Sequence, residues 1–174
     1  MRYIVLLRGI NVGGNHKVVM KELREYVEAL NFVNVSTYLN SGNLLFDSEE
    51  SAQDVKKKIT EMFSSTYDFD IPILIKTQQQ IKAIEYAIPE NWYNDEVHKT
   101  DVAYLFSEAD LPEIIDELPI KKEFVDIRYV QGALFYRVAR ADYNKSQLNK
   151  IIGHKLYKLM TIRNINTARK LAKI

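Results

Sequence analysis

The sequence predicts an α+β protein made of two ferredoxin-like βαββαβ units, the second incomplete, with a basic C-terminal helix. Over residues 1–77 the hydrophobic pattern follows the order strand, helix, strand, strand, helix, strand. A similar order recurs after residue 100, and 174 residues suffice for two small domains. We therefore divide the chain into a first unit over 1–77, a linking helix and loop over 78–100, and a second unit with the C-terminal helix over 101–174.

The first unit is expected to begin with a buried strand over 2–8, which is apolar and contains β-branched residues. A loop over 9–17 then leads to an amphipathic helix, and a hairpin over 34–48 turns at the polar residues 40–43. Ser51 and Asp54 have the spacing of a helix cap, and a last strand covers 71–76. Apolar residues at helical spacing mark the first helix at Val19, Met20, Leu23, Tyr26, Val27 and Leu30, and the second at Ala52, Val55, Ile59, Met62 and Phe63.

The second unit follows a predicted linking helix near 78–87 and a loop over 89–100. We expect a strand over 101–107, a helix over 110–118 with an early proline, and a hairpin over 125–139 that turns at Gln131-Gly132. A short basic helix near 164–173 ends the chain. A longer helix over 146–159 is predicted from a face formed by Leu148, Ile151, Ile152, Leu156 and Leu159.

The formal net charge of +1 conceals an uneven distribution of charged residues. Residues 1–120 hold 11 Lys/Arg and 20 Asp/Glu, whereas residues 121–174 hold 13 Lys/Arg and three Asp/Glu. From Tyr143 onward there are eight basic residues and no acidic one. This split indicates an anionic partner. Packing of the basic end against the acidic body is the alternative, and the sequence leaves both open.

Several classes of site and location are disfavoured by what the sequence lacks. There is no cysteine, which rules out disulfides and thiolate ligands and fits a cytoplasmic protein. The apolar N-terminal run is too short for a membrane span, and we expect no membrane partner. The three histidines, His16, His98 and His154, lie far apart without ligand spacing, so we expect no metal and no cofactor.

The loop after the first strand has the composition of a phosphate-binding loop but not its spacing. Gly9, Gly13 and Gly14 match neither a Walker loop nor a dinucleotide fingerprint, and no hydroxyl residue follows Lys17. A glycine loop before a helix can still offer backbone N–H groups to an anion, with charge added by Arg8 and Lys17. The simpler interpretation is a β-to-α connection whose glycines only permit the turn.

The other polar stretches are the hairpin turn at 40–43 and the C-terminal tail. Ser41 and Asn43 either face a ligand or bond to their own backbone, and we expect this turn at the opposite end of the sheet from the 9–17 loop. In the tail, Arg163 can bind phosphate or carboxylate in bidentate fashion. Asn164 and Asn166 are suited to capping the last helix, which is the structural alternative.

The sequence resembles the bacterial "domain of unknown function 1697" family over nearly its whole length. The motifs that carry this resemblance are R-G-I-N-V-G-G at 8–14, Y-x-x-S-G-N at 38–43, a basic residue with serine at 145–146, and T-x-R-N-x-N-T at 161–167. Ile162 and Ile165 depart from the Thr and Trp usual in the family. The resemblance implies an α+β protein without an established activity. It groups the polar residues of the motifs into one candidate ligand-binding set: Arg8, Asn11, Gly13, Gly14, Lys17, Ser41, Asn43, Lys145, Ser146, Arg163, Asn164 and Asn166.

Three functions remain in competition on sequence grounds. The first is a binding module for an anionic ligand, either nucleic acid or a phosphorylated small molecule. Its nucleic-acid form could use Tyr129, Phe135 and Tyr136 as a stacking platform on the sheet, although they also fit as ordinary strand residues. The second is an enzyme acting on a phosphorylated substrate, although no acid–base pair is evident. The third is a non-catalytic assembly protein that forms a homodimer.

Overall fold

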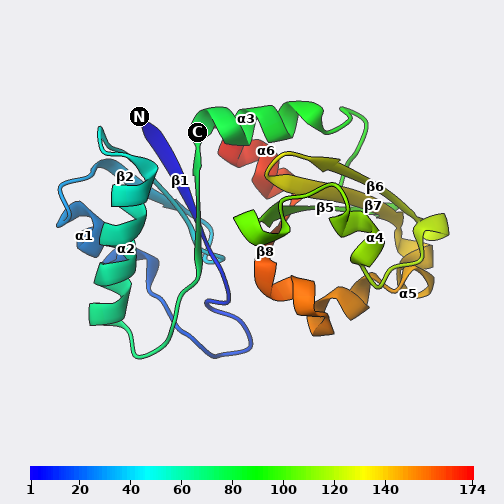
Figure 1. The fold of residues 1–174 in the computed structure, drawn as a ribbon, viewed down its shortest axis with the longest axis horizontal. Helices are drawn as coiled ribbons and strands as arrows, with labels where there is room; N and C mark the ends of the chain where they lie inside the picture. The colour runs from blue at the N-terminus through cyan, green and yellow to red at the C-terminus, as the bar shows by residue number, and fades with distance from the viewer. The chain divides into compact units, whose positions relative to one another are not determined.

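The computed structural model describes all residues 1–174 and divides the chain into two units (Figure 1). Unit 1 comprises Met1–Gln78 and unit 2 comprises Gln79–Ile174. Each unit contains one four-stranded antiparallel sheet together with helices, so the protein is of the α+β class.

Unit 1 has the element order strand, helix, strand, strand, helix, strand, and its strands lie in the sheet in the order β2-β3-β1-β4. The outer strand β2 contains a bulge between Val33 and Ser36, where Asn34 takes a φ of 54°. The elements are β1 (Arg2–Leu7), α1 (Met20–Glu28), β2 (Val33–Tyr38), β3 (Asn43–Asp47), α2 (Ala52–Thr66) and β4 (Ile73–Thr77).

The core of unit 1 forms because α1 and α2 lay their apolar stripes on one face of the sheet (Figure 1). Leu23 of α1 and Ile59 of α2 are completely buried there, against alternate residues of β1 such as Val5. The predicted cap of α2 is confirmed, because Ser51 Oγ accepts a hydrogen bond from the backbone N–H of Asp54 at 3.2 Å. The hydrophobic spacing of the sequence therefore determines which helix faces are buried.

Unit 2 contains a second four-stranded sheet, in the order β6-β7-β5-β8. Short 3-10 turns replace much of the helix between its strands. The helices and strands are α3 (Gln78–Ala87), β5 (His98–Leu105), α4 (Ile114–Glu117), β6 (Val125–Val130), β7 (Ala133–Ala139), α5 (Tyr143–Ser146), β8 (Met160–Asn164) and α6 (Ile165–Lys173). The 3-10 turns are η1 (Ser107–Ala109), η2 (Lys122–Phe124), η3 (Arg140–Asp142), η4 (Leu148–Gly153) and η5 (Lys155–Leu159).

Both faces of the unit 2 sheet are covered. Figure 1 shows α3 and α6 on one side of it, and α4 and α5 on the other. Phe135 is 1% exposed and meets Trp92 edge to face at 5.8 Å, whereas Tyr136 is 4% exposed within the opposite core. Tyr129 is half-buried and donates a hydrogen bond to Asp110. Of the two interpretations of these residues, the stacking platform is wrong and the ordinary strand residue is confirmed, because the rings of Phe135 and Tyr136 are used in packing.

Unit 2 differs from the sequence prediction in two elements. The helix expected over 146–159 is absent, since Gln147 has a φ of 60° that ends α5, and only η4 and η5 follow. Ile152, assigned to the buried face of that helix, is 65% exposed. The expectation of an incomplete second unit is also wrong in its strands, because β8 pairs with β5 and completes the sheet. In addition, the helix expected over 110–118 is shorter, with α4 confined to Ile114–Glu117.

None of the helices is both long enough and apolar enough to cross a lipid bilayer.

Candidate functional site

The loop between β1 and α1 is a small closed hairpin. The backbone N–H of Asn11 donates to His16 O at 3.0 Å, and that of Asn15 donates to Val12 O at 3.1 Å. Gly13 and Gly14 occupy the turn with φ values of 59° and 79°, a combination typical of a type I′ turn. A Cβ at either glycine would meet nothing within 4 Å. These two glycines are therefore required by backbone conformation and not by the close approach of another group.

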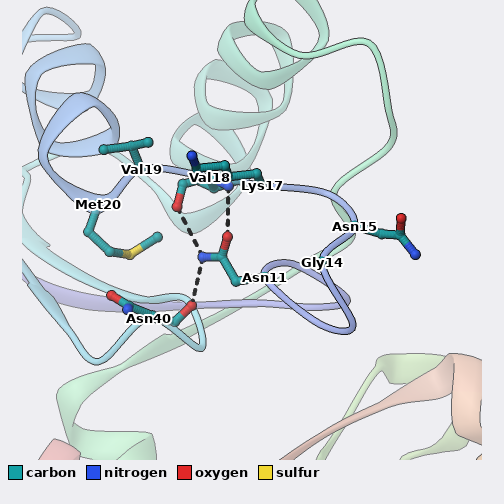
Figure 2. A pocket seen from close by; sticks show the side chains of 8 residues that line it. All are labelled: Asn11, Gly14, Asn15, Lys17, Val18, Val19, Met20 and Asn40. Carbon is teal, nitrogen blue, oxygen red and sulfur yellow. Dashed lines mark hydrogen bonds between the residues drawn. The ribbon is translucent and has the colours of Figure 1, made fainter.

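Asn11 joins this loop to two other parts of unit 1 (Figure 2). Its side-chain Oδ1 accepts a hydrogen bond from Val18 N at 2.9 Å, and its Nδ2 donates to Val18 O at 3.0 Å. The same Nδ2 donates to the backbone oxygen of Asn40 at 2.9 Å. One amide thus fixes the approach to α1 and the hairpin turn between β2 and β3 at the same time.

The hairpin turn therefore lies at the same end of the sheet as the β1–α1 loop, and the sequence expectation of opposite ends is wrong. β1 and β3 are antiparallel neighbours with Leu6 opposite Asn43, so the end of β1 adjoins the start of β3. The backbone N–H of Leu7 donates to Gly42 O at 2.8 Å. Gly42 has a φ of 81°, and a Cβ there would lie 2.7 Å from Leu7 Cβ. Only glycine fits this contact.

A pocket of about 450 Å³ lies beside the contact between the two turns (Figure 2). We call it the loop pocket. Its wall includes the segment from Lys17 to Met20, where α1 begins, and the exposed Lys17 supplies its only charged side chain. No side chain caps the N-terminus of α1, because the N-cap residue is Val19. The lining residues are Asn11, Gly14, Asn15, Lys17, Val18, Val19, Met20 and Asn40.

The loop pocket contains only part of the candidate set that the sequence assigned to unit 1. Asn11, Gly14 and Lys17 line it, whereas Arg8, Gly13, Ser41 and Asn43 do not. Asn43 is completely buried, and its Nδ2 donates to Tyr38 O at 2.7 Å and to Ser41 Oγ at 3.2 Å. This amide therefore stabilises its own hairpin turn. No motif spacing marks the lining of a pocket, so nothing in the sequence indicated its other five residues: Asn15, Val18, Val19, Met20 and Asn40.

In unit 2 the candidate residues Lys145 and Ser146 make local contacts. Lys145 Nζ lies 2.9 Å from Asp142 Oδ1 in an exposed ion pair three residues apart. Ser146 is completely buried, and its hydroxyl donates to Tyr143 O at 2.6 Å. The same hydroxyl accepts from the backbone N–H of Leu148 at 3.3 Å. Ser146 thus terminates α5 by satisfying backbone groups that the short helix leaves unpaired.

The motif at 161–167 fixes the junction between β8 and α6. Arg163 is 7% exposed, and its Nη1 donates to Thr161 Oγ1 at 2.9 Å and to Ile162 O at 3.0 Å. Burial lowers the pKa of Arg163 to about 10, because the charged guanidinium is removed from water. Asn164 is the N-cap of α6, with its Oδ1 accepting from Asn166 N at 2.7 Å. The capping role considered for this stretch is therefore present at Asn164.

Comparison with known proteins identifies a family but no activity. The family model "Protein of unknown function (DUF1697)" matches residues 1–136. The solved structure of the conserved bacterial protein SP0830 from Streptococcus pneumoniae is similar, with a TM-score of 0.87 and 27% identity, covering 99% of this chain and 97% of that one. No curated protein matches the sequence. The neighbouring structure is described as a conserved bacterial protein, so its description assigns no ligand or reaction.

Proposed function

This chain belongs to the DUF1697 family of proteins of unknown function, and we propose that it binds a small anionic ligand, such as a phosphorylated metabolite, in the loop pocket of unit 1. The observation that carries the proposal is the start of α1, which lines the pocket without a capping side chain and beside Lys17. The first turn of an α-helix has backbone N–H groups without intrahelical partners and a partial positive charge. These groups and an ammonium together favour an anion.

The remaining wall of the loop pocket indicates what kind of anion would fit. The uncharged polar residues of the lining are Asn11, Asn15 and Asn40. Val19 and Met20 make part of the wall apolar. A volume of about 450 Å³ lies within the range of small-molecule sites. This composition favours a metabolite with one phosphate or carboxylate and a small apolar or neutral polar body over a highly charged polyanion.

Catalysis is the less supported alternative for this pocket. Its lining contains no aspartate, glutamate or histidine that could transfer a proton. The loop histidine, His16, is absent from the lining; it stacks on Phe69 at 4.5 Å, and its Nδ1 lies 3.1 Å from Gly9 O. We therefore favour binding over an enzyme acting on a phosphorylated substrate.

The experiment is a thermal-shift screen of the full chain against inorganic phosphate, sugar phosphates and nucleoside monophosphates. A ligand at about 100 times its Kd should raise the Tm by about 5–10 °C. Lys17→Ala should reduce this shift, and Val19→Asp should abolish it, because a carboxylate at the N-cap occupies the first-turn N–H groups and repels the anion.

Lys57→Ala provides the matched control, since Lys57 is an exposed lysine on α2 that is absent from the pocket lining. It should leave the shift unchanged. The proposal fails if no compound stabilises the chain, or if the Val19→Asp protein is stabilised as strongly as the native one.

Assembly is a second candidate function, favoured by exposed apolar residues on the two turns that Asn11 joins. Val12 is 67% exposed and Leu39 is 53% exposed. Exposed apolar side chains mark a contact between proteins when they gather in one patch, and these two belong to turns that a hydrogen bond from Asn11 to Asn40 ties together. Light scattering after size-exclusion chromatography should then give a dimer mass that Val12→Ser with Leu39→Ser reduces to the monomer mass.

We further propose that both units have the ferredoxin-like topology. The strand order β2-β3-β1-β4 in unit 1 and its equivalent β6-β7-β5-β8 in unit 2 support this classification. In unit 2, α5 and the turns η4 and η5 stand where the second helix of the pattern would lie. The final helix α6, which carries Arg169, Lys170 and Lys173, is the candidate for the basic C-terminal helix.

A further inference from the structure

We propose that unit 2 has a separate binding site for single-stranded nucleic acid, at a pocket of about 640 Å³ formed by α3, the segment after it, β6 and α6. We call it the basic pocket. Its lining combines three basic side chains with two tyrosines: Arg128, Arg169, Lys173, Tyr86 and Tyr93. The site is independent of the loop pocket, because it uses no residue of unit 1.

Arg169 is the fixed centre of this pocket. Its Nη2 donates to the backbone oxygens of Pro89 and Glu90, each at 3.2 Å, and its Nε lies 3.9 Å from Glu85 Oε1. The guanidinium also lies 5.3 Å from the centre of the Tyr93 ring. These contacts hold α6 against the segment that follows α3, so the wall of the pocket is ordered before any ligand arrives.

The two tyrosines provide exposed aromatic surface. Tyr86 is 91% exposed and Tyr93 is 53% exposed. Both rings therefore leave apolar surface in contact with water, although its burial would be favourable. Exposed rings next to arginine are the groups on which unpaired bases stack in single-strand binding proteins. Such stacking needs no particular base sequence, because every base offers a π-face.

The cations for the phosphates come from Arg128 and Lys173, which are both exposed. Arg128 lies 5.3 Å from the centre of the buried Trp92 ring, so the position of its charge is partly fixed. Two acids, Glu85 and Glu90, also line the pocket, and Glu85 lies near Arg169. The basic side chains still outnumber the acidic ones, within a C-terminal region that has no acid after Asp142.

The observations favour a single strand over a duplex. Phosphate contacts alone would serve either form, but bases can stack on Tyr86 and Tyr93 only when they are unpaired. The sheet of unit 2 offers no alternative platform, since Phe135 and Tyr136 are buried. We therefore place the single strand on the side of unit 2 that α3 and α6 cover, at the basic pocket.

The test is fluorescence anisotropy of the full chain with labelled oligo-U and oligo-dT of about 12 nucleotides and with a duplex of equal length, over a salt titration. The native chain should bind the single strands more tightly than the duplex. Tyr86→Ala should weaken single-strand binding about fivefold or more, whereas Tyr86→Phe should retain it. Arg128→Ala with Lys173→Ala should make the slope of log K against log salt shallower by about 1.4, because two phosphate contacts are lost.

The charge-matched control is Lys150→Ala with Lys158→Ala, which removes two exposed lysines of unit 2 that lie outside the pocket. Binding that falls equally in both double variants would reflect net charge and overturns the proposal. Absence of binding at low salt, or equal binding of duplex and single strand, also overturns it. Should Arg128→Ala lower the Tm, Lys173→Ala alone, at the exposed end of α6, gives the same test with a slope change of about 0.7.

Discussion

Asn11 belongs to a motif whose composition suggests ligand binding, but its side chain is engaged in hydrogen bonds within the fold. Its side chain satisfies both backbone groups of Val18 and the oxygen of Asn40. It also adopts a φ of 53°, a left-handed conformation that asparagine tolerates better than most residues. The composition of the 9–17 loop indicated a polar role correctly, but the partners of the amide depend on the antiparallel pairing of β1 and β3, which no local pattern specifies.

Asn11→Ala should lower the free energy of unfolding by about 2–4 kcal/mol, because three hydrogen bonds are lost and a left-handed residue is strained. Urea unfolding measures this change. Asn15→Ala is the matched control, since Asn15 is exposed at the other side of the same turn, and its replacement should change stability by less than about 0.5 kcal/mol. Equal effects of the two substitutions would contradict the role given to Asn11.

Ionisation of the Asp47 carboxyl makes the stability of unit 1 depend on pH. A hydrogen bond from the Asn34 side chain at 2.7 Å, followed by the charge of Arg2, lowers the pKa of this carboxyl below its ordinary 3.8. A lowered carboxyl pKa adds stability above the unfolded value and loses it as pH falls through the folded value. The contribution of Asp47 should therefore be complete at neutral pH, begin to fall near pH 3.8, and be lost as the pH drops through the lower pKa of the folded state.

Comparison of the native chain with Asp47→Asn in urea at a series of pH values checks this expectation. The native chain should be more stable by about 1 kcal/mol at pH 7, and the difference should shrink below pH 3.8. A difference between the two proteins that stays constant down to pH 2 would show that Asp47 has no coupling to folding.

At the scale of elements, the long helices and every strand except β8 could be predicted, and the short irregular segments could not. The predicted face of α2 is buried at Val55, Ile59, Met62 and Phe63. In α1 only Leu23 and Val27 of the predicted face are buried, whereas Val19 and Tyr26 are exposed. The prediction over 146–159 failed because a 3-10 turn also brings residues three apart together, so Leu148 and Ile151 fit both structures. Gln147 in the left-handed conformation decides between them, and its sequence gives no signal of that.

The start of α6 depends on its N-cap residue, Asn164. Asn164→Ala should destabilise the chain by about 1 kcal/mol, because the first-turn N–H of Asn166 loses its acceptor. Asn164→Asp should retain most of the stability. Asn166→Ala serves as the control, since Asn166 is exposed and contributes only its backbone N–H to the cap. Thermal unfolding of the three variants gives the order of Tm values.

At the scale of the whole molecule, the two units repeat one local arrangement. The N–H of Leu7 donates to Gly42 O at 2.8 Å, and in unit 2 the N–H of Leu105 donates to Gly132 O at 3.0 Å. In unit 2, Gly132 N also donates to Asp110 Oδ1 at 2.6 Å, so a side chain of the loop after β5 binds the hairpin turn. The order of elements indicated this repetition, whereas β8 was not predicted, because its five residues, of mixed polarity, lie between segments expected to be helices.

The sheets predict which backbone amides exchange slowest with solvent. β1 and β3 are the inner strands of unit 1, and β5 and β7 are those of unit 2, so their amides are paired on both sides and buried. Hydrogen exchange should be slowest in these four strands and fastest in β2, where the bulge near Asn34 interrupts the pairing. Protection in β2 equal to that in β1 would contradict this order.

Because β8 passes directly into α6, the strand fixes the rotation of the helix about its own axis. Asn164 ends the strand and Ile165 begins the helix, with no residue between them. One inserted residue would turn every later side chain by about 100° around the helix axis. Ile165, Ala168 and Leu171, which are now buried, would be carried toward water while Lys170 rotated inward. The exposed side of α6 should therefore tolerate many substitutions, whereas an insertion or deletion at this junction should destabilise unit 2.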